Sequence, residues 1–306
     1  MKNKSGGNQG QNTRMKNILR CLIHSVGLTQ FAYALYFDFK YVVIPPEISP
    51  LFKTFGGKLK FLTIWNVILQ TLYFAVSLVN DIFGSNETNP KKKPITRVFK
   101  DYVLASVAFP VSMFVCLTFW GIWLVDRELV FPRALDPYFP TWLNHVMHTN
   151  ILVFSTLDIF FCFRQYPSRV KGIMGLLFFM AGYLVWTFVI FYKSGMWVYP
   201  ILNVLTWEQR ALFFAMSLVI VVGLYFVGEF LNSIIWKSEL KQFEHSGKQQ
   251  KKGGWKEKSD WHSNKKGKKD NSGPDEASPR NKRDEPPRQG GKGGKLTKRK
   301  DSDRDK

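Results

Sequence analysis

The sequence has few cysteines, and nothing around them resembles a metal site. Its three cysteines, Cys21, Cys116 and Cys162, all lie inside apolar runs. No two of them have the spacing that metal sites use, so we expect them to pack as small apolar side chains. The chain also lacks a small-residue cleavage site after its first apolar run, and it ends without a dilysine, KDEL-like or prenylation signal. We therefore interpret the first apolar run as a signal anchor.

The mean hydropathy of -0.12 averages two unlike regions. Residues 237–306 contain almost no aliphatic side chains and hold 22 Lys and Arg against 12 Asp and Glu, which is half of the formal net charge of +20. Such a composition cannot bury enough apolar surface to offset the chain entropy, so we expect a disordered, Lys-rich cytosolic tail. One hypothesis for the tail is contact with anionic lipid; the alternative is a solvated tail without a specific partner. Nucleic acid is not the expected partner.

The rest of the chain holds six apolar runs near the roughly 20 residues that a bilayer-spanning helix needs. The runs occupy residues 17–37, 61–83, 102–125, 142–163, 172–192 and 211–235. They predict an all-α, polytopic membrane bundle of about six transmembrane helices over residues 17–236. A short cytosolic segment, residues 1–16, precedes the bundle, and the tail follows it. A soluble helical protein would not carry six such runs separated by short polar loops.

Loop charge predicts the orientation of the bundle. The segments before the first run, after the second run and after the fourth run carry four, five and three Lys and Arg, and the basic tail follows the sixth run. The segments between carry four, two and two. The positive-inside bias therefore places both termini in the cytosol, in a multi-pass protein of the endoplasmic reticulum or plasma membrane. The glycosylation sequon that begins at Asn86 would then face the cytosol and stay unmodified.

A polar histidine-asparagine cluster opens the fourth apolar run. At about 100° per helical residue, Asn144, His148, Ser155 and Asp158 share one face, while His145 points elsewhere. Polar side chains are costly in hydrocarbon, so such a stripe faces a bundle interior or a water-filled cavity and marks a functional candidate. Asp158 lies about 15 Å along the axis from His148, which is too far for contact.

A second polar intrusion, Thr63 with Asn66 and Gln70, lies on one face of the second run. With cytosolic termini, Thr63 and His148 enter from the same leaflet, within about 5 Å of each other along the membrane normal. A threonine hydroxyl needs an adjacent base to act as a nucleophile, and histidine suits that role near neutral pH. Asn144 could orient the imidazole or, with Asn66, help to hold an oxyanion.

Three structural alternatives stay open at this point. A threonine at a helix start is often a cap or bonds back to its own helix. A membrane histidine often makes a structural hydrogen bond. His145 and His148 could also share a metal ion, but no further ligand lies at that depth, so we expect neither metal nor cofactor.

Several ordered motifs resemble those of the androgen-induced protein family, over about residues 20–240. They are Gly56-Gly57-Lys58-Leu59-Lys60-Phe61-Leu62-Thr63, Asp126-Arg127-Glu128, Trp142-Leu143-Asn144-His145 with Met147-His148-Thr149, Gln165-Tyr166-Pro167-Ser168-Arg169, Gly195-Met196-Trp197-Val198-Tyr199-Pro200, and Gly228-Glu229 with Leu231-Asn232 and Trp236. Each motif is short, but together and in this order they are specific. The basic tail has no counterpart in the family pattern.

The resemblance implies a multi-pass membrane hydrolase that cleaves fatty-acid esters of hydroxy fatty acids. The catalytic threonine and histidine of the family match Thr63 and His148, which selects the second histidine over the first. From charge and depth, Lys58, Lys60 or Arg127 could receive the carboxylate of the lipid substrate. The alternatives are a non-catalytic membrane regulator that acts by protein contacts and a small-solute transporter.

Overall fold

The computed structural model describes residues 5–88, 90 and 92–246, and these residues form helices and loops without a strand. The predicted disorder of the tail is wrong for its first ten residues, 237–246, which are helical. The rest of the tail, residues 247–306, lies outside the described range, and with it the predicted lipid contact. Helix α1, Ser5–Tyr41, runs across the predicted boundary at residue 16. The all-α class predicted from the apolar runs is confirmed.

Within the described part of the chain, five helices are long and apolar enough to cross a membrane: Arg14–Tyr41 within α1, Leu62–Phe83 (α2), Ile95–Leu129, Arg169–Ser194 (α7) and Trp207–Ile235 (α9). The third combines α3 (Ile95–Val103), the π-helix η3 (Leu104–Ala108), α4 (Phe109–Asp126) and the 3-10 turn η4 (Arg127–Leu129). It begins before the predicted start at residue 102. A π-turn directly before Pro110 suits a residue that cannot donate a backbone hydrogen bond.

The fourth predicted run, residues 142–163, is also helical, but it is not among the five. It consists of α5 (Thr141–His145), the π-helix η6 (Val146–Asn150) and α6 (Ile151–Phe161) in direct succession. Its Asn144, His148, Ser155 and Asp158 are all buried, whereas His145 is exposed. This helix therefore carries the predicted polar stripe into the protein interior.

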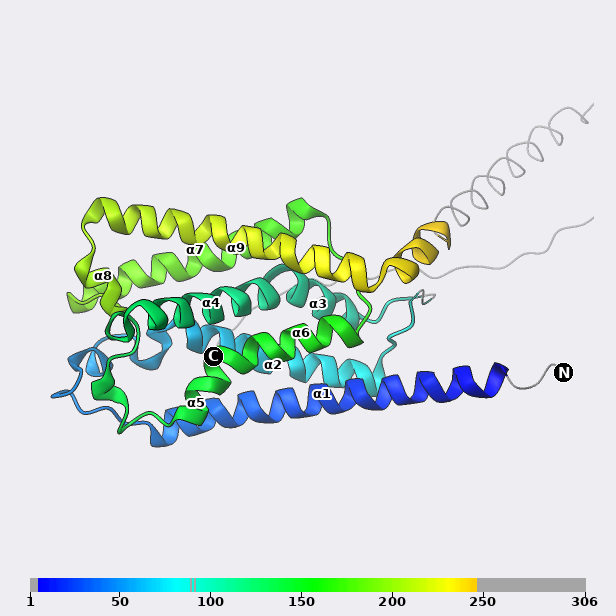
Figure 1. Cartoon of the computed structure of the whole chain (residues 1–306), viewed down its shortest axis with the longest axis horizontal. Helices are drawn as coiled ribbons and strands as arrows, with labels where there is room; N and C mark the ends of the chain where they lie inside the picture. The colour runs from blue at the N-terminus through cyan, green and yellow to red at the C-terminus, as the bar shows by residue number, and fades with distance from the viewer. Residues whose placement is uncertain (1–4, 89, 91, 247–306) are drawn as a thin grey trace, which may run out of the picture. The chain divides into compact units, whose positions relative to one another are not determined.

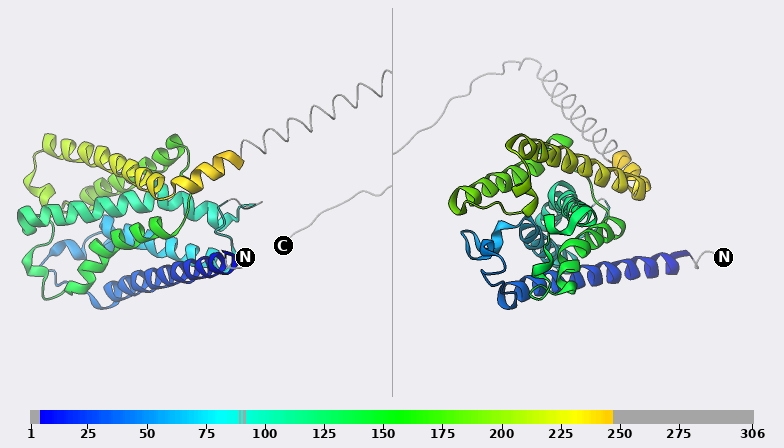
Figure 2. Two further views of the ribbon diagram at one scale, coloured as in Figure 1. Left: turned by 45° about the vertical axis from the view of Figure 1, so that its right-hand side comes forward. Right: turned by 60° about the vertical axis from the view of Figure 1, so that its left-hand side comes forward.

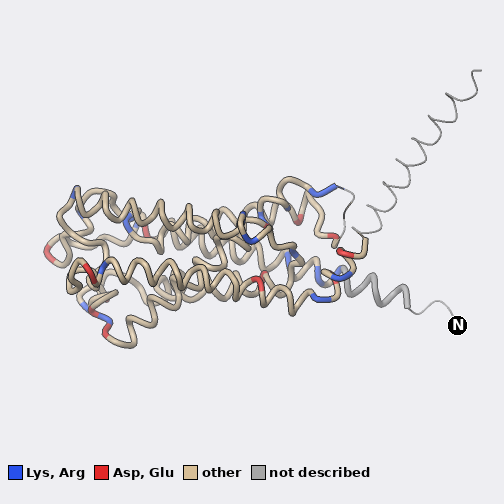
Figure 3. The backbone as a smooth tube through the Cα atoms, turned by 90° about the horizontal axis from the view of Figure 1, so that it is seen from above, with Lys and Arg blue, Asp and Glu red and all other residues tan. Residues whose placement is uncertain are grey.

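The helices alternate in direction, so α1 begins and α9 ends at the same end of the bundle (Figure 1). The three views agree that α1 lies on one side, α7 and α9 lie on the other, and α2, α4 and α6 lie between (Figure 2). Most Lys, Arg, Asp and Glu gather at the two ends, and the length between is nearly free of them (Figure 3). The outer surface is apolar, with Phe178 and Leu124 each 84% exposed. This distribution is the one that a lipid environment requires.

The loops at the other end from the termini are short and partly helical. They include η1 (Pro50–Lys53) and η2 (Gly57–Lys60) after α1, η5 (Arg133–Leu135) after α4, and α8 (Pro200–Val204) after α7. Gly56 and Gly57 have φ of 90° and 52°, a backbone region that favours glycine. These loops cover the end of the bundle where α2 and α5 begin.

At the end of the bundle near the termini, α1, α2 and α6 are joined by a polar cluster of His24, Tyr73, Asp81, Asp158 and Arg164. The His24 Nδ1 lies 2.6 Å from Asp81 Oδ2, and its Nε2 lies 2.7 Å from Asp158 Oδ1. Tyr73 and the buried guanidinium of Arg164 both donate to Asp158 Oδ2. Asp158 is fully buried. The carboxylate therefore has partners for both of its oxygens.

Neutralising Asp158 is expected to destabilise the protein strongly. In Asp158→Asn, Arg164 and His24 keep their burial but lose the charge between them, and breaking a buried pair in this way costs about 3–5 kcal/mol. Unfolding of the purified protein in detergent, followed by temperature and by SDS titration, measures the loss. Asp136→Asn is the matched control, because that carboxylate is 53% exposed beside Arg127 and surface pairs contribute about 1 kcal/mol or less. Equal stability of the two variants would contradict the assignment.

Candidate active site

Thr63 lies in the first turn of α2. The N-cap of that helix is Phe61, in extended conformation with φ of -90° and ψ of 130°. The first N–H groups of a helix have no acceptor within it. Here the Leu62 N–H donates to the hydroxyl oxygens of Tyr183 and Tyr199, at 3.0 Å each. Two side chains from other elements therefore fix the start of α2 and, with it, the position of Thr63.

His148 lies in the π-helix η6, and its ring reaches Thr63. The distance from Thr63 Oγ1 to His148 Nε2 is 3.2 Å. The other ring nitrogen, Nδ1, lies 3.0 Å from the backbone carbonyl oxygen of Asn144. A carbonyl only accepts hydrogen bonds, so Nδ1 carries the proton and the lone pair of Nε2 faces the threonine hydroxyl. This tautomer is the one that can take a proton from Thr63.

An aromatic ring also packs against the face of the His148 imidazole. Phe119 of α4 stacks on His148 with ring centroids 3.6 Å apart and planes 15° from parallel. The His148 residue is only 6% exposed. A π-turn at a histidine is notable because such turns occur frequently at functional sites. The ring is thus fixed by a carbonyl, an aromatic face and a hydroxyl.

His145 has different surroundings. Its exposed ring stacks on Trp120, with centroids 5.3 Å apart, and its Nδ1 lies 3.3 Å from Thr149 Oγ1. It therefore has no part in the Thr63–His148 pair. Among the described residues, the three-ligand group with metal-binding geometry lies elsewhere and consists of His24, Asp158 and Cys162. Hydrogen bonds of the polar cluster already occupy the imidazole and carboxylate of that group.

Two pockets meet at Thr63. The first, the helix pocket, has about 860 Å³ of empty space, and no charged residue lines it. It lies among α2, α4, α7 and α9, with walls that include Phe114, Leu184, Phe213 and Leu218. The second, the loop pocket, has about 980 Å³ and lies beneath the loops near residues 44–61, 130–139 and 198–200. Both pockets are lined by Thr63, Phe119, Val130 and Tyr199, while His148 lines the loop pocket.

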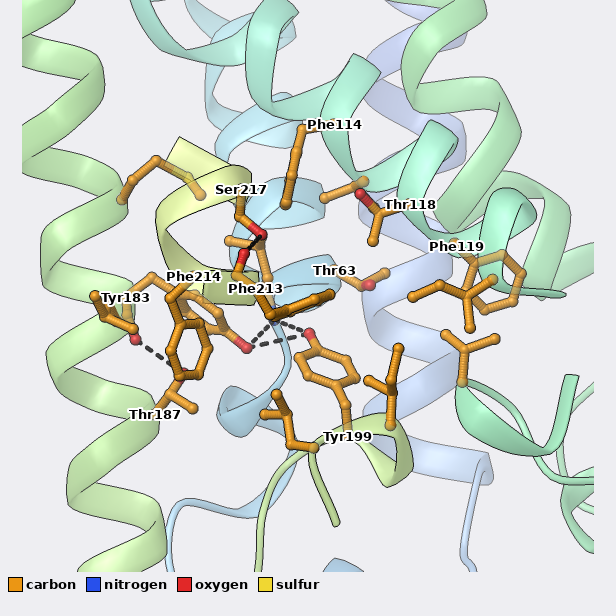
Figure 4. A pocket seen from close by; sticks show the side chains of 18 of the residues that line it. Thr63, Phe114, Thr118, Phe119, Tyr183, Thr187, Tyr199, Phe213, Phe214 and Ser217 are labelled. Carbon is orange, nitrogen blue, oxygen red and sulfur yellow. Dashed lines mark hydrogen bonds between the residues drawn. The ribbon is translucent and has the colours of Figure 1, made fainter. Parts of the chain in front are cut away.

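Figure 4 shows the helix pocket from close by, with the Thr63 side chain on its wall. The Tyr199 hydroxyl points to the place where α2 begins and is joined there to Tyr183 by a hydrogen bond of 3.1 Å. A ligand with two apolar arms could place one arm in each pocket and its central atoms at the threonine hydroxyl. Mostly apolar walls with a few polar groups are usual for pockets that bind small molecules.

The three predicted carboxylate-binding cations have different surroundings. Lys58 lines the loop pocket, where its ammonium group lies 3.1 Å from Asp38 Oδ2 and donates to the Val42 carbonyl at 2.8 Å. Lys60 is buried and donates to Leu51 O and Thr54 Oγ1; its burial lowers its pKa to about 8. Arg127 pairs with Asp136 outside both pockets, at 2.5 Å. Lys58 is therefore the cation best placed for a ligand.

The two asparagines also differ from each other. Asn144 supports His148 through its backbone carbonyl, while its side-chain Oδ1 has no partner within the described part of the chain. Asn66 is fully buried one helical turn from Thr63 and accepts a hydrogen bond of 3.3 Å from Ser112. Its Nδ2 is without a partner among the residues described. An oxyanion role for either side chain stays a prediction.

Comparison with known proteins supports the resemblance. The family profile described as FAR-17a/AIG1-like protein matches residues 19–233. The chain belongs to this family. It is 35% identical to the human androgen-induced gene 1 protein over 206 residues, which are 65% of this chain and 86% of that protein. It is 31% identical to the human androgen-dependent TFPI-regulating protein over 216 residues, 71% of this chain and 93% of that protein. No solved structure matches the chain.

A more distant relative extends the comparison to yeast. The fission-yeast UPF0641 membrane protein PJ4664.05 is 22% identical over 176 residues, which are 57% of this chain and 75% of that protein. The region matched by the family profile contains both Thr63 and His148 and excludes the tail. The family and the helices together make this a multi-pass membrane protein.

Proposed function

We propose that the protein is a membrane-embedded hydrolase that cleaves fatty-acid esters of hydroxy fatty acids, with Thr63 as nucleophile and His148 as base. The observation that carries the proposal is the 3.2 Å contact from Thr63 Oγ1 to His148 Nε2 at the junction of the two pockets. The tautomer of His148, the Thr63 hydroxyl and the space in the two pockets all suit acyl transfer. The decisive experiment is ester turnover by the purified protein and its loss in Thr63→Ala.

The reaction follows from these positions. His148 Nε2 takes the hydroxyl proton while Thr63 Oγ1 attacks the ester carbonyl, whose π electrons move to the oxygen. The tetrahedral intermediate then collapses, and the imidazolium gives its proton to the departing alkoxide, which leaves as the hydroxy fatty acid. Water, deprotonated by His148, attacks the acyl-threonine, and the second collapse releases the fatty acid and restores Thr63.

The substrate class is supported by the pockets. An ester of this kind has two long apolar arms, one of them ending in a carboxylate. We place the plain acyl arm in the helix pocket, which has no charged wall, and the carboxylate-bearing arm in the loop pocket, which contains Lys58. A ligand carboxylate at Lys58 would compete with Asp38, so this part of the site selects substrates whose acid group reaches that far.

A regulator that acts by protein contacts is the second candidate. Relatives in human, mouse, rat and hamster are named androgen-dependent TFPI-regulating proteins, and this name describes a regulator. The same purified protein and its variants distinguish the two functions, because a regulator that acts by protein contacts needs neither the Thr63 hydroxyl nor the His148 imidazole. Transport of a small solute would instead appear as flux without hydrolysis.

We also propose that both termini face the cytosol, which makes a prediction for glycosylation. Asn86 and the termini of the bundle are at the same end, so the Asn86 sequon should carry no glycan in cells. Glu47→Asn completes a sequon with Ser49 in the loop at the other end and should add one. Endoglycosidase-sensitive mass shifts on gels report both. A shift in the wild type that disappears in Asn86→Gln would invert the proposed topology.

A further inference from the structure

Among the hydrogen-bond donors at the start of α2, one hydroxyl does not donate to a carbonyl oxygen. The Tyr183 hydroxyl donates to the carbonyl oxygen of Lys60 at 3.0 Å. The Leu62 N–H donates to both tyrosine oxygens. Only the proton of Tyr199 is not used on a carbonyl, and the acceptor nearest to it is the Tyr183 oxygen, 3.1 Å away. A neutral hydroxyl oxygen is a weaker acceptor than an anion, so this proton can be redirected.

Tyr199 also lies where the reaction would develop charge. It lines both pockets, as Thr63 does, whereas Tyr183 lines only the helix pocket. Its hydroxyl is bonded to the amide of Leu62, the residue joined to Thr63 by a peptide bond. Burial raises the pKa of Tyr199, so the group keeps its proton and acts as a donor at neutral pH.

We propose that Tyr199 is a third catalytic residue, which donates a hydrogen bond to the oxyanion of the tetrahedral intermediate. The inference rests on the proposed hydrolase function. As Thr63 attacks, the Tyr199 O–H turns from the Tyr183 oxygen to the carbonyl oxygen that gains charge. The bond from the Leu62 N–H to the Tyr199 oxygen polarises that donor further. The proton stays on Tyr199 throughout, and the Tyr199 O–H turns back to the Tyr183 oxygen when the intermediate collapses.

A second donor is available from the backbone. The N–H groups of Ile64 and Trp65 donate to Phe61 O, and that of Leu62 is used on the tyrosines. The N–H of Thr63 makes no hydrogen bond to any described residue. Its place in the first turn of α2 puts it at the positive end of the helix dipole. The nucleophile's own amide and the Tyr199 hydroxyl would then share the oxyanion, as paired donors do in other acyl-transfer sites.

The test compares Tyr199→Phe with the wild type in full-length protein in lipid nanodiscs. The substitution leaves the Leu62 N–H bonded to Tyr183, so the start of α2 should persist. We expect kcat to fall about 10²–10³-fold, as when one oxyanion donor is removed, with KM within about twofold because ground-state binding is unchanged. A trifluoromethyl ketone with a fatty acyl chain adds Thr63 reversibly to give a tetrahedral alkoxide. Its affinity should fall in proportion to kcat.

A non-hydrolysable ether analogue of the ester forms no oxyanion, so its affinity should not change. Tyr225→Phe is the control for loss of a buried phenol outside both pockets and should retain full activity. Tyr183→Phe loses the bond to Lys60 and should lower the unfolding temperature without selective loss of ketone binding. Equal losses of ether and ketone binding in Tyr199→Phe, or an unchanged kcat, would overturn the inference. Absence of Thr63-dependent turnover in the wild type would instead overturn the hydrolase itself.

Discussion

Thr63→Ala is expected to lower ester hydrolysis by roughly 10⁴-fold or more, because the acyl intermediate of the proposed reaction forms on the Thr63 hydroxyl. The hydroxyl oxygen lies 3.2 Å from His148 Nε2, and the substitution removes that oxygen together with the γ-methyl group. A fluorophosphonate probe should label the wild type and leave the variant unlabelled. Release of the hydroxy fatty acid, measured by mass spectrometry with purified protein, gives the rate.

Two further threonine variants make this result specific. Thr63→Ser keeps the hydroxyl and loses a methyl group, which costs at most about 1 kcal/mol of side-chain ordering, or about fivefold in rate. Thr71→Ala removes a hydroxyl two turns further along the same helix, where it only bonds back to Val67 O at 2.8 Å. That variant should hydrolyse the ester normally. Labelling that persists in Thr63→Ala would exclude Thr63 as the nucleophile.

The membrane architecture was predictable because it depends on run length and loop charge, which are local properties. The approach of Thr63 to His148 was predictable in part, since residue counts place both near one leaflet and each lies on a polar helical face. Which helices are neighbours, and so whether the two side chains meet, depends on tertiary packing and could not be predicted from these counts. The stacked Phe119 comes from α4, and one phenylalanine among the 27 in the chain has nothing in the sequence to distinguish it.

Other parts of the site had no sequence signal. Asn144 was expected to act through its amide, but it supports His148 through a backbone carbonyl, which every residue has. Tyrosine is common at membrane interfaces, so the sequence alone does not distinguish Tyr199 as a residue of the site. The partners of His24 are 57 and 134 residues away in the sequence, so a lone histidine in the first apolar run gave no sign of the cluster.

His148→Ala is expected to lower kcat by about 10²–10⁴-fold, the usual contribution of a positioned general base. A backbone carbonyl rather than a carboxylate holds its Nδ1. The carbonyl fixes the tautomer, but it carries no full charge to stabilise the imidazolium. The imidazole therefore supplies all the proton transfers of each turnover without the help of an acid. Turnover and the rate of probe labelling should fall together, because both require an activated Thr63.

His145→Ala is the matched control, three residues away on the same helix. Its exposed ring contacts Trp120 and Thr149 rather than Thr63, so the variant should retain wild-type turnover. Comparison of His148→Ala with His145→Ala shows whether activity needs His148 as a base or only needs histidine in this polar segment. If both variants lost activity equally, the loss would reflect the segment as a whole, for example through bound metal or packing. Full turnover by His148→Ala would exclude His148 as the base that accepts the Thr63 proton, and with it the proposed catalytic dyad.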